Sequence, residues 1–169
     1  MAAAAFCGHS YGAWLALSYA RHSPVRVTRL ALPDPTSCFA GLRLSYRLRA
    51  VPVLARPGAD RARGFLEWEA GGMPLEPLSL ALACGGAEFR GSKIVMPRRP
   101  KPAELQAMSV PALVLLAAES KAHDIRRVGA SAERLLPHVT VGVLPGASHH
   151  SLPATSPDRL NQELAAFLG

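Results

Sequence analysis

The sequence is poor in cysteine. It holds 3 cysteines among 169 residues, at Cys7, Cys38 and Cys84. They are too few and too scattered for a disulfide framework, and none belongs to a Cys-x-x-Cys pair of the kind that binds zinc. We therefore interpret all three as small, buried, apolar residues. The pattern gives no reason to expect a metal ion or another cofactor.

Long apolar runs are also missing. No run reaches the roughly 18 to 20 residues that a membrane-spanning helix needs, and residues 1–5 lack the basic start and the length of a secretory signal. At 49% hydrophobic content, however, the chain can bury one sizeable core. We therefore expect one cytoplasmic domain over residues 1–169, without a membrane partner.

Acidic and aromatic side chains are scarce as well. The chain has 12 acidic residues against 19 lysines and arginines, which gives a net charge of +7. This excess raises the question of a nucleic-acid partner. Aromatic residues make up 6% of the chain and are not interleaved with the scattered arginines, as a stacking platform for bases would require. We therefore expect a solvated, arginine-rich surface and no nucleic-acid partner.

One short motif stands out near the start of the chain, where residues 8–12 read Gly-His-Ser-Tyr-Gly. An apolar run precedes it over residues 2–7, and apolar positions with helical spacing follow over about residues 11–22. The pattern predicts a strand, a tight turn and a helix. Such a turn exposes the hydroxyl of Ser10, and glycines on either side relieve crowding between strand and helix. The helix N-terminus favours negative charge that develops nearby.

In this setting the motif resembles the nucleophile elbow of the α/β-hydrolase family. The resemblance implies that Ser10 is the nucleophile and that the backbone N–H of Tyr11 is a donor of the oxyanion hole. A serine at this position argues against the family's dehalogenases and epoxide hydrolases, which use an aspartate there. The implied function is a serine hydrolase that cleaves a small carboxylic ester or related acyl substrate through an acyl-enzyme on Ser10.

The later chain alternates strands and helices, as a parallel sheet requires. Residues 25–32 are rich in β-branched side chains, residues 110–117 form a continuous apolar run, and residues 139–144 read as the last strand. Helices are expected to begin near Ile125 and Pro157. With the resemblance, this predicts a partial α/β-hydrolase fold. Its mostly parallel sheet is flanked by helices, carries a helical lid insertion and lacks the family's early strands.

Residues 35–108 interrupt this alternation. They are rich in proline and glycine, with helical pieces expected over residues 62–70 and 75–83. A disordered insertion would not carry so many apolar residues, and long ordered insertions are commonly functional. The resemblance implies that this segment is a lid over the active-site end of the sheet. The candidate pocket walls are Phe39, Leu42, Tyr46, Phe65, Trp68 and Met73.

The resemblance also implies a base near the C-terminus. A serine hydroxyl is a poor nucleophile at neutral pH, so a histidine must accept its proton and a carboxylate must hold that imidazole in the right tautomer. Residues 145–149 read Pro-Gly-Ala-Ser-His and match the family's histidine loop. By this match His149 is the base, and His150 should point toward the lid or solvent.

Three carboxylates remain open as the acid of the triad. We rank Asp124 first, although it can equally be the N-cap of the helix that begins near Ile125. Glu119, directly after the third predicted strand, is second. Asp34, which follows the second predicted strand, is third, because some family members place their acid there.

The resemblance covers nearly all of this chain but only the later part of a typical family member. The family's sheet has strands before the elbow, and a loop after one of them supplies a second oxyanion donor. The early strands would be absent if the sequence is a fragment, if its start is wrongly assigned, or if another chain supplies them. An alternative function follows: a non-catalytic remnant or interaction module that associates through the exposed edge of the strand over residues 2–7.

Overall fold

The structure is a computed structural model that describes residues 2–89, 95–155 and 157–169. Its four strands form one parallel sheet in the order β1-β2-β3-β4. Each strand falls where the sequence pattern predicts one. The strands are β1 (Ala4–Cys7), β2 (Val27–Pro33), β3 (Ala112–Ala117) and β4 (Val139–Leu144).

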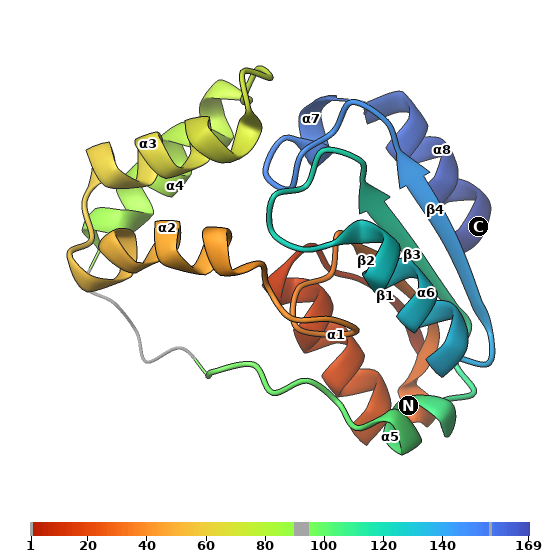
Figure 1. The fold of residues 1–169 in the computed structure, drawn as a ribbon. Helices are drawn as coiled ribbons and strands as arrows, with labels where there is room; N and C mark the ends of the chain where they lie inside the picture. The colour runs from red at the N-terminus through yellow and green to blue at the C-terminus, as the bar shows by residue number, and fades with distance from the viewer. Residues whose placement is uncertain (1, 90–94, 156) are drawn as a thin grey trace.

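Helices make the crossovers that parallel strands require. In Figure 1, α1 and α6 cover one face of the sheet and α8 covers the other. None of the helices in the described ranges has both the length and the apolar character needed to cross a membrane. The elements between and after the strands are α1 (Tyr11–His22), the 3₁₀ turn η1 (Pro24–Arg26), α2 (Leu44–Ala55), α3 (Ala59–Ala70), α4 (Pro77–Glu88), α5 (Pro102–Gln106), α6 (Ile125–Leu135), α7 (Leu152–Thr155) and α8 (Pro157–Leu168).

The sheet divides the core into two layers, and its inner strand β3 contributes side chains to both. All six residues of β3 are buried, and successive side chains of a strand point to opposite faces. Ala112, Val114 and Leu116 pack into the cluster shared with α1 and α6. Leu113 and Leu115 pack into the smaller cluster under α8. This two-sided burial is why the sequence of β3 reads as an unbroken apolar run.

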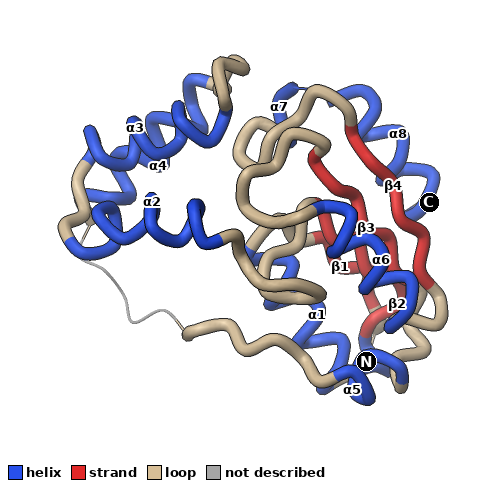
Figure 2. The backbone as a smooth tube through the Cα atoms, in the orientation of Figure 1, coloured by secondary structure: helices blue, strands red, loops and turns tan. Residues whose placement is uncertain are grey.

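Three helices, α2, α3 and α4, follow β2 and stand apart from the sheet. Figures 1 and 2 show them on the side where the loops after β3 and β4 gather. The sequence predicts helical pieces over residues 62–70, which lie within α3, and over residues 75–83, which overlap α4, but no helix over α2. The reason is Pro52, which lies inside α2 and normally ends or kinks a helix.

Strand β1 is an edge of the described sheet, where it pairs with β2. Most of its side chains are exposed, including Cys7. This corrects the expectation that all three cysteines are buried. Cys38 and Cys84 are buried, whereas Cys7 lies on an edge strand that pairs with one neighbouring strand in the described sheet and is exposed.

Candidate active site

Ser10 lies on the turn between β1 and α1. Its backbone has φ 56° and ψ −118°, a conformation that is rare outside glycine and costs on the order of 1–3 kcal/mol. The Ser10 amide donates a 3.2 Å hydrogen bond to the carbonyl of Pro33, at the end of β2. The strained turn is therefore held at the carboxyl end of the sheet, where open α/β sheets bind ligands.

Gly8 is the glycine that this turn requires. A Cβ on Gly8 would lie 2.3 Å from the carbonyl oxygen of Gly12 and 2.9 Å from the amide nitrogen of Ala13. A Cβ on Gly12 would meet no atom within 4 Å. The expectation that both glycines relieve crowding is therefore corrected: the missing side chain matters at Gly8, where the backbone of Gly12 packs against it.

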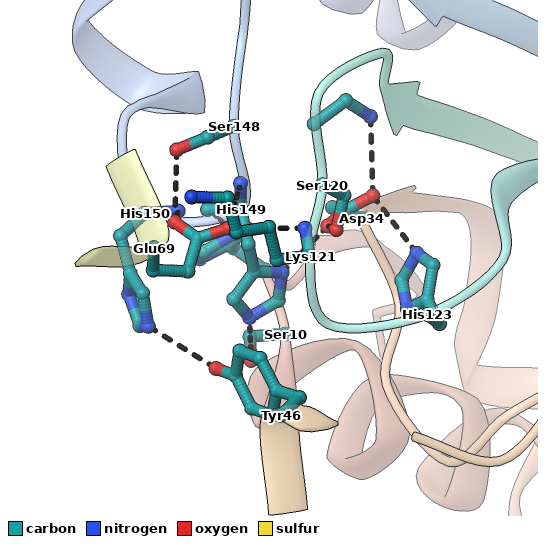
Figure 3. Close-up of polar contacts among 12 residues, drawn as sticks. Ser10, Asp34, Tyr46, Glu69, Ser120, Lys121, His123, Ser148, His149 and His150 are labelled. Atoms are coloured by element: carbon teal, nitrogen blue, oxygen red, sulfur yellow. Dashed lines mark hydrogen bonds and ion pairs between the residues drawn. The ribbon is translucent and has the colours of Figure 1, made fainter. Parts of the chain in front are cut away.

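The hydroxyl of Ser10 faces the imidazole of His149, which lies 139 positions later in the chain, with Oγ 2.7 Å from Nε2 (Figure 3). His149 sits in the loop after β4 and is 1% exposed. Ser148 and Ser151 brace this loop, because each hydroxyl accepts a hydrogen bond from the other residue's amide, at 2.9 and 3.3 Å. These hydrogen bonds fix the position of the loop that carries His149 beside Ser10.

Asp34 lies on the other side of the imidazole. Its Oδ2 is 2.5 Å from Nδ1 of His149, and the carboxylate is fully buried. Asp34 directly follows β2, and its backbone has φ 38°. With Nδ1 donating to Asp34, Nε2 of the neutral imidazole is free to accept the proton of Ser10.

Three further donors surround the carboxylate of Asp34. The Ala117 amide donates to Oδ1 at 3.1 Å, the Ser120 hydroxyl to Oδ2 at 2.8 Å, and Nε2 of His123 to Oδ1 at 3.1 Å. Burial by itself would raise the pKa of Asp34. The hydrogen bonds and charge of His123 and His149 outweigh burial and hold this pKa well below its usual range. Asp34 therefore stays ionised at neutral pH.

The other two candidate acids lie elsewhere. Asp124 is exposed, and its Oδ1 accepts a 3.2 Å hydrogen bond from the amide of Arg127 as the N-cap of α6. Glu119 is also exposed, and its amide donates to the carbonyl of Ala147 at 2.9 Å. We therefore revise the order of the acids and place Asp34 first, on the ground that its carboxylate is the one bonded to His149.

Two more histidines flank His149. His9 donates from Nε2 to the carbonyl oxygen of His149 at 2.8 Å. Nε2 of His150 lies 3.3 Å from the hydroxyl of Tyr46 on α2, so His150 points toward the helices, one of the two directions expected for it. Burial, together with the nearby His149, lowers the pKa of His9 to about 4 and that of His150 to about 3. Both are therefore neutral at pH 7.

Aromatic side chains from α2 and α3 cover the histidines. The ring of Tyr46 lies edge-on to His149 at 6.2 Å, and Phe65 lies edge-on to His150 at 6.0 Å. A cavity of about 70 Å³ lies beside His150, between α3 and α4. Phe39, by contrast, packs in the main core and lines a different cavity, beside Arg99 and Arg127, and not the one beside His150.

The backbone N–H of Tyr11 is at the first position of α1. The first amides of a helix have no carbonyl partner within it, so this group is free to face negative charge near Ser10. In the described part of the chain, no three His, Cys, Asp or Glu side chains are arranged to hold a metal ion.

Sequence reasoning missed the groups that hold these residues in place. His123 and Ser120, in the loop after β3, bond to Asp34. Glu69, near the end of α3, is 0% exposed and bonds to the loop of His149. No motif surrounds this glutamate, so its burial could not be read from the sequence.

Residues 2–163 match the sequence profile of the Alpha/beta hydrolase family. The chain belongs to this family. No curated protein sequence matches this α/β hydrolase. Its fold, with the parallel sheet and the strand–turn–helix around Ser10, is the one that the resemblance predicts.

Solved structures with the same fold include two esterases of Bacillus subtilis. Carboxylesterase CesB has a TM-score of 0.88 and 22% identity, and the match covers 99% of this chain and 60% of that chain. Naproxen esterase (carboxylesterase NP) has a TM-score of 0.87 and 20% identity, over 100% of this chain and 61% of that chain. This α/β hydrolase therefore spans about three-fifths of the length of these esterases.

A third similar structure is the 2-hydroxy-6-oxo-6-phenylhexa-2,4-dienoate hydrolase of Rhodococcus sp. strain RHA1. It has a TM-score of 0.77 and 14% identity, and the match covers 99% of this chain and 64% of that chain. At such identities the likeness is one of fold. The chemistry of this α/β hydrolase depends on its own side chains.

Proposed function

We propose that the protein is a serine hydrolase that cleaves a carboxylic ester or a related acyl compound through an acyl-enzyme on Ser10. The observation that carries the proposal is one continuous line of contacts. Ser10 Oγ lies 2.7 Å from His149 Nε2, and His149 Nδ1 lies 2.5 Å from Asp34 Oδ2. The order serine, acid, histidine along the chain is that of α/β hydrolases, and membership of that family supports the proposal.

The proposed proton path follows these contacts. As the Ser10 oxygen attacks the substrate carbonyl carbon, Nε2 of His149 accepts the hydroxyl proton, and Asp34 stabilises the imidazolium that results. The tetrahedral intermediate then collapses, the bond to the leaving alcohol breaks, and His149 gives its proton to that alcohol. In the second half, His149 deprotonates a water that attacks the acyl-enzyme, and the proton returns to Ser10 as the acid product leaves.

The negative charge of the tetrahedral intermediate needs hydrogen-bond donors. We assign one donor to the backbone N–H of Tyr11, at the N-terminus of α1, where the helix dipole also favours an anion. We further propose that residues 35–108 form a lid within the single domain 1–169. Tyr46 and Phe65, which lie over His149 and His150, support this role.

A fluorophosphonate probe tests the proposed function directly, because it forms a stable bond with an activated serine. We expect labelling of the folded protein, with the adduct located on Ser10 by peptide mass spectrometry. The Ser10→Ala protein should remain folded and unlabelled. If the probe labels Ser10→Ala as strongly as the unaltered protein, Ser10 is not the nucleophile.

The exposed edge of β1 favours a second candidate function. Among the described residues, β1 pairs with β2 alone, so the other edge of β1 is open to a further strand. The second candidate is therefore an interaction module that pairs through this edge. A folded sample that resists the probe, yet elutes as an assembly in size-exclusion chromatography, would favour this function over hydrolysis. The substitution Ala5→Lys in β1 should then release the monomer.

A further inference from the structure

Glu69 is a buried carboxylate that the proposed chemistry does not use. It lies in the last turn of α3 and is 0% exposed. Its Oε1 accepts hydrogen bonds from the amides of His149, at 3.1 Å, and Lys121, at 3.3 Å. Its Oε2 accepts from the amide of His150, at 3.0 Å, and from the hydroxyl of Ser148, at 2.8 Å. Figure 3 shows these groups converging on it.

A carboxylate is tolerated in the interior of a folded protein only when hydrogen bonds occupy its acceptor sites. An ionised carboxylate offers about four acceptor sites, and a buried one without partners is strongly unfavourable. Within the described ranges, Glu69 has four donors and forms no ion pair with Lys or Arg. Its burial is therefore compensated only while α3 sits against the loops that supply the donors.

Those two loops carry the groups around the candidate triad. The loop after β4 contains His149 itself, with Ser148 and His150 on either side. The loop after β3 contains Ser120 and His123, which bond to Asp34. One carboxylate from the proposed lid is thus bonded to the backbone of both loops that set the geometry of the base and the acid.

A second contact joins the same two elements. The ammonium group of Lys121 donates to the carbonyl of Trp68 and lies 5.1 Å from the centre of the Trp68 ring. Trp68 directly precedes Glu69, so the end of α3 is fixed to the loop after β3 at two adjacent residues. Glu67, two residues earlier on α3, is exposed.

We propose that Glu69 is a positioning residue, which holds the His149 loop and the loop after β3 in catalytic register and makes that register depend on the seating of α3. This inference rests on the proposed function. Glu69 does not touch the reacting atoms, since its contacts to His149 and His150 run through their backbone amides.

The substitution Glu69→Gln tests the proposal without changing the size of the side chain. Both oxygens of Glu69 accept from a backbone amide, and a backbone N–H cannot reverse its direction. Whichever way the new side-chain amide turned, its NH₂ group would face a backbone N–H. Glu67→Gln is the matched control, because it makes the same change at an exposed position of the same helix.

The readouts are kcat and KM for an activated short-chain ester and the rate of fluorophosphonate labelling at Ser10. For Glu69→Gln we expect kcat and the labelling rate to fall together by about 10 to 100 fold, because small displacements of catalytic groups lower the rate by that factor. KM should stay within about threefold of its value in the unaltered protein. Glu69→Asp, which keeps the charge but shortens the side chain, should recover part of the loss. Glu67→Gln should match the unaltered protein.

A folded Glu69→Gln protein with unchanged kcat would overturn the proposal, and so would an equal loss in Glu67→Gln. If Glu69→Gln does not fold, amide exchange in the unaltered protein decides. The amides of Lys121, His149 and His150 should then be protected from exchange, and rapid exchange would overturn the proposal. Exchange needs no turnover, so a protein that resists the probe but protects these amides would refute the proposed function and leave the anchoring by Glu69 standing.

Discussion

Asp34 and His149 are 115 positions apart in the chain, yet Asp34 Oδ2 lies 2.5 Å from His149 Nδ1. The sheet brings them together. β2 pairs with β3, and β3 pairs with β4, in parallel register. The loops after β2 and β4 therefore meet at the same edge, and the Asp34 amide donates to the Leu115 carbonyl of β3 at 2.6 Å.

The first prediction concerns the acid. Asp34→Asn should lower kcat by up to about 10⁴ fold, because an amide can no longer hold the imidazole in the required tautomer. Asp124→Asn should leave kcat nearly unchanged, since asparagine is also a good N-cap, and Glu119→Gln should do the same. Steady-state kinetics on the three proteins decide. A large loss in Asp124→Asn with an active Asp34→Asn protein would restore the original ranking.

The second prediction concerns the base. His149→Ala should lower turnover by about 10³ to 10⁶ fold, because Ser10 then has no group to accept its proton. His150→Ala should keep most activity, since its side chain contacts Tyr46 and not Ser10. Ester hydrolysis and circular dichroism of both proteins provide the check. An inactive but folded His150→Ala protein would assign the base to the neighbouring position.

The third prediction concerns the turn at the nucleophile. Gly8→Ala should destabilise the protein by at least about 1–3 kcal/mol, because the added carbon would overlap the backbone of Gly12. Gly12→Ala should be neutral or stabilising by up to about 1 kcal/mol, because alanine is the better helix former and the space is open. Urea unfolding of the two variants measures the contrast. Equal stabilities would mean that the two backbones do not approach this closely.

The fourth prediction concerns pH. Burial lowers the pKa of His150 to about 3 and that of His9 to about 4, from the ordinary value of 6.5. As the pH falls through 6.5, the unfolded chain takes up protons that the folded chain does not bind, so the free energy of unfolding should decrease toward pH 4. His150→Gln removes one of these groups and should flatten the decrease between pH 7 and pH 5. An identical decrease in both proteins would exclude His150 as a cause.

The sequence by itself determined where the four strands lie and suggested two residues of the candidate site. Alternating and continuous apolar runs specify β1 to β4, since side chains on a strand repeat every two residues and a central parallel strand is buried on both faces. The Gly-x-Ser-x-Gly turn and the loop over residues 145–149 carry the family resemblance that proposes Ser10 and His149, and both signals depend only on neighbouring residues.

Only the tertiary structure shows which of the three candidate acids is bonded to His149 and which groups hold the candidate site in place. Asp34, Asp124 and Glu119 each follow a strand or precede a helix, so local pattern cannot rank them. The choice depends on which loop the sheet register places beside His149. Glu69 was even harder to predict from the sequence than Asp34. Its proposed role depends on how α3 packs against two loops about 50 and 80 positions away in the chain. Contacts between residues so far apart produce no periodic pattern in the sequence.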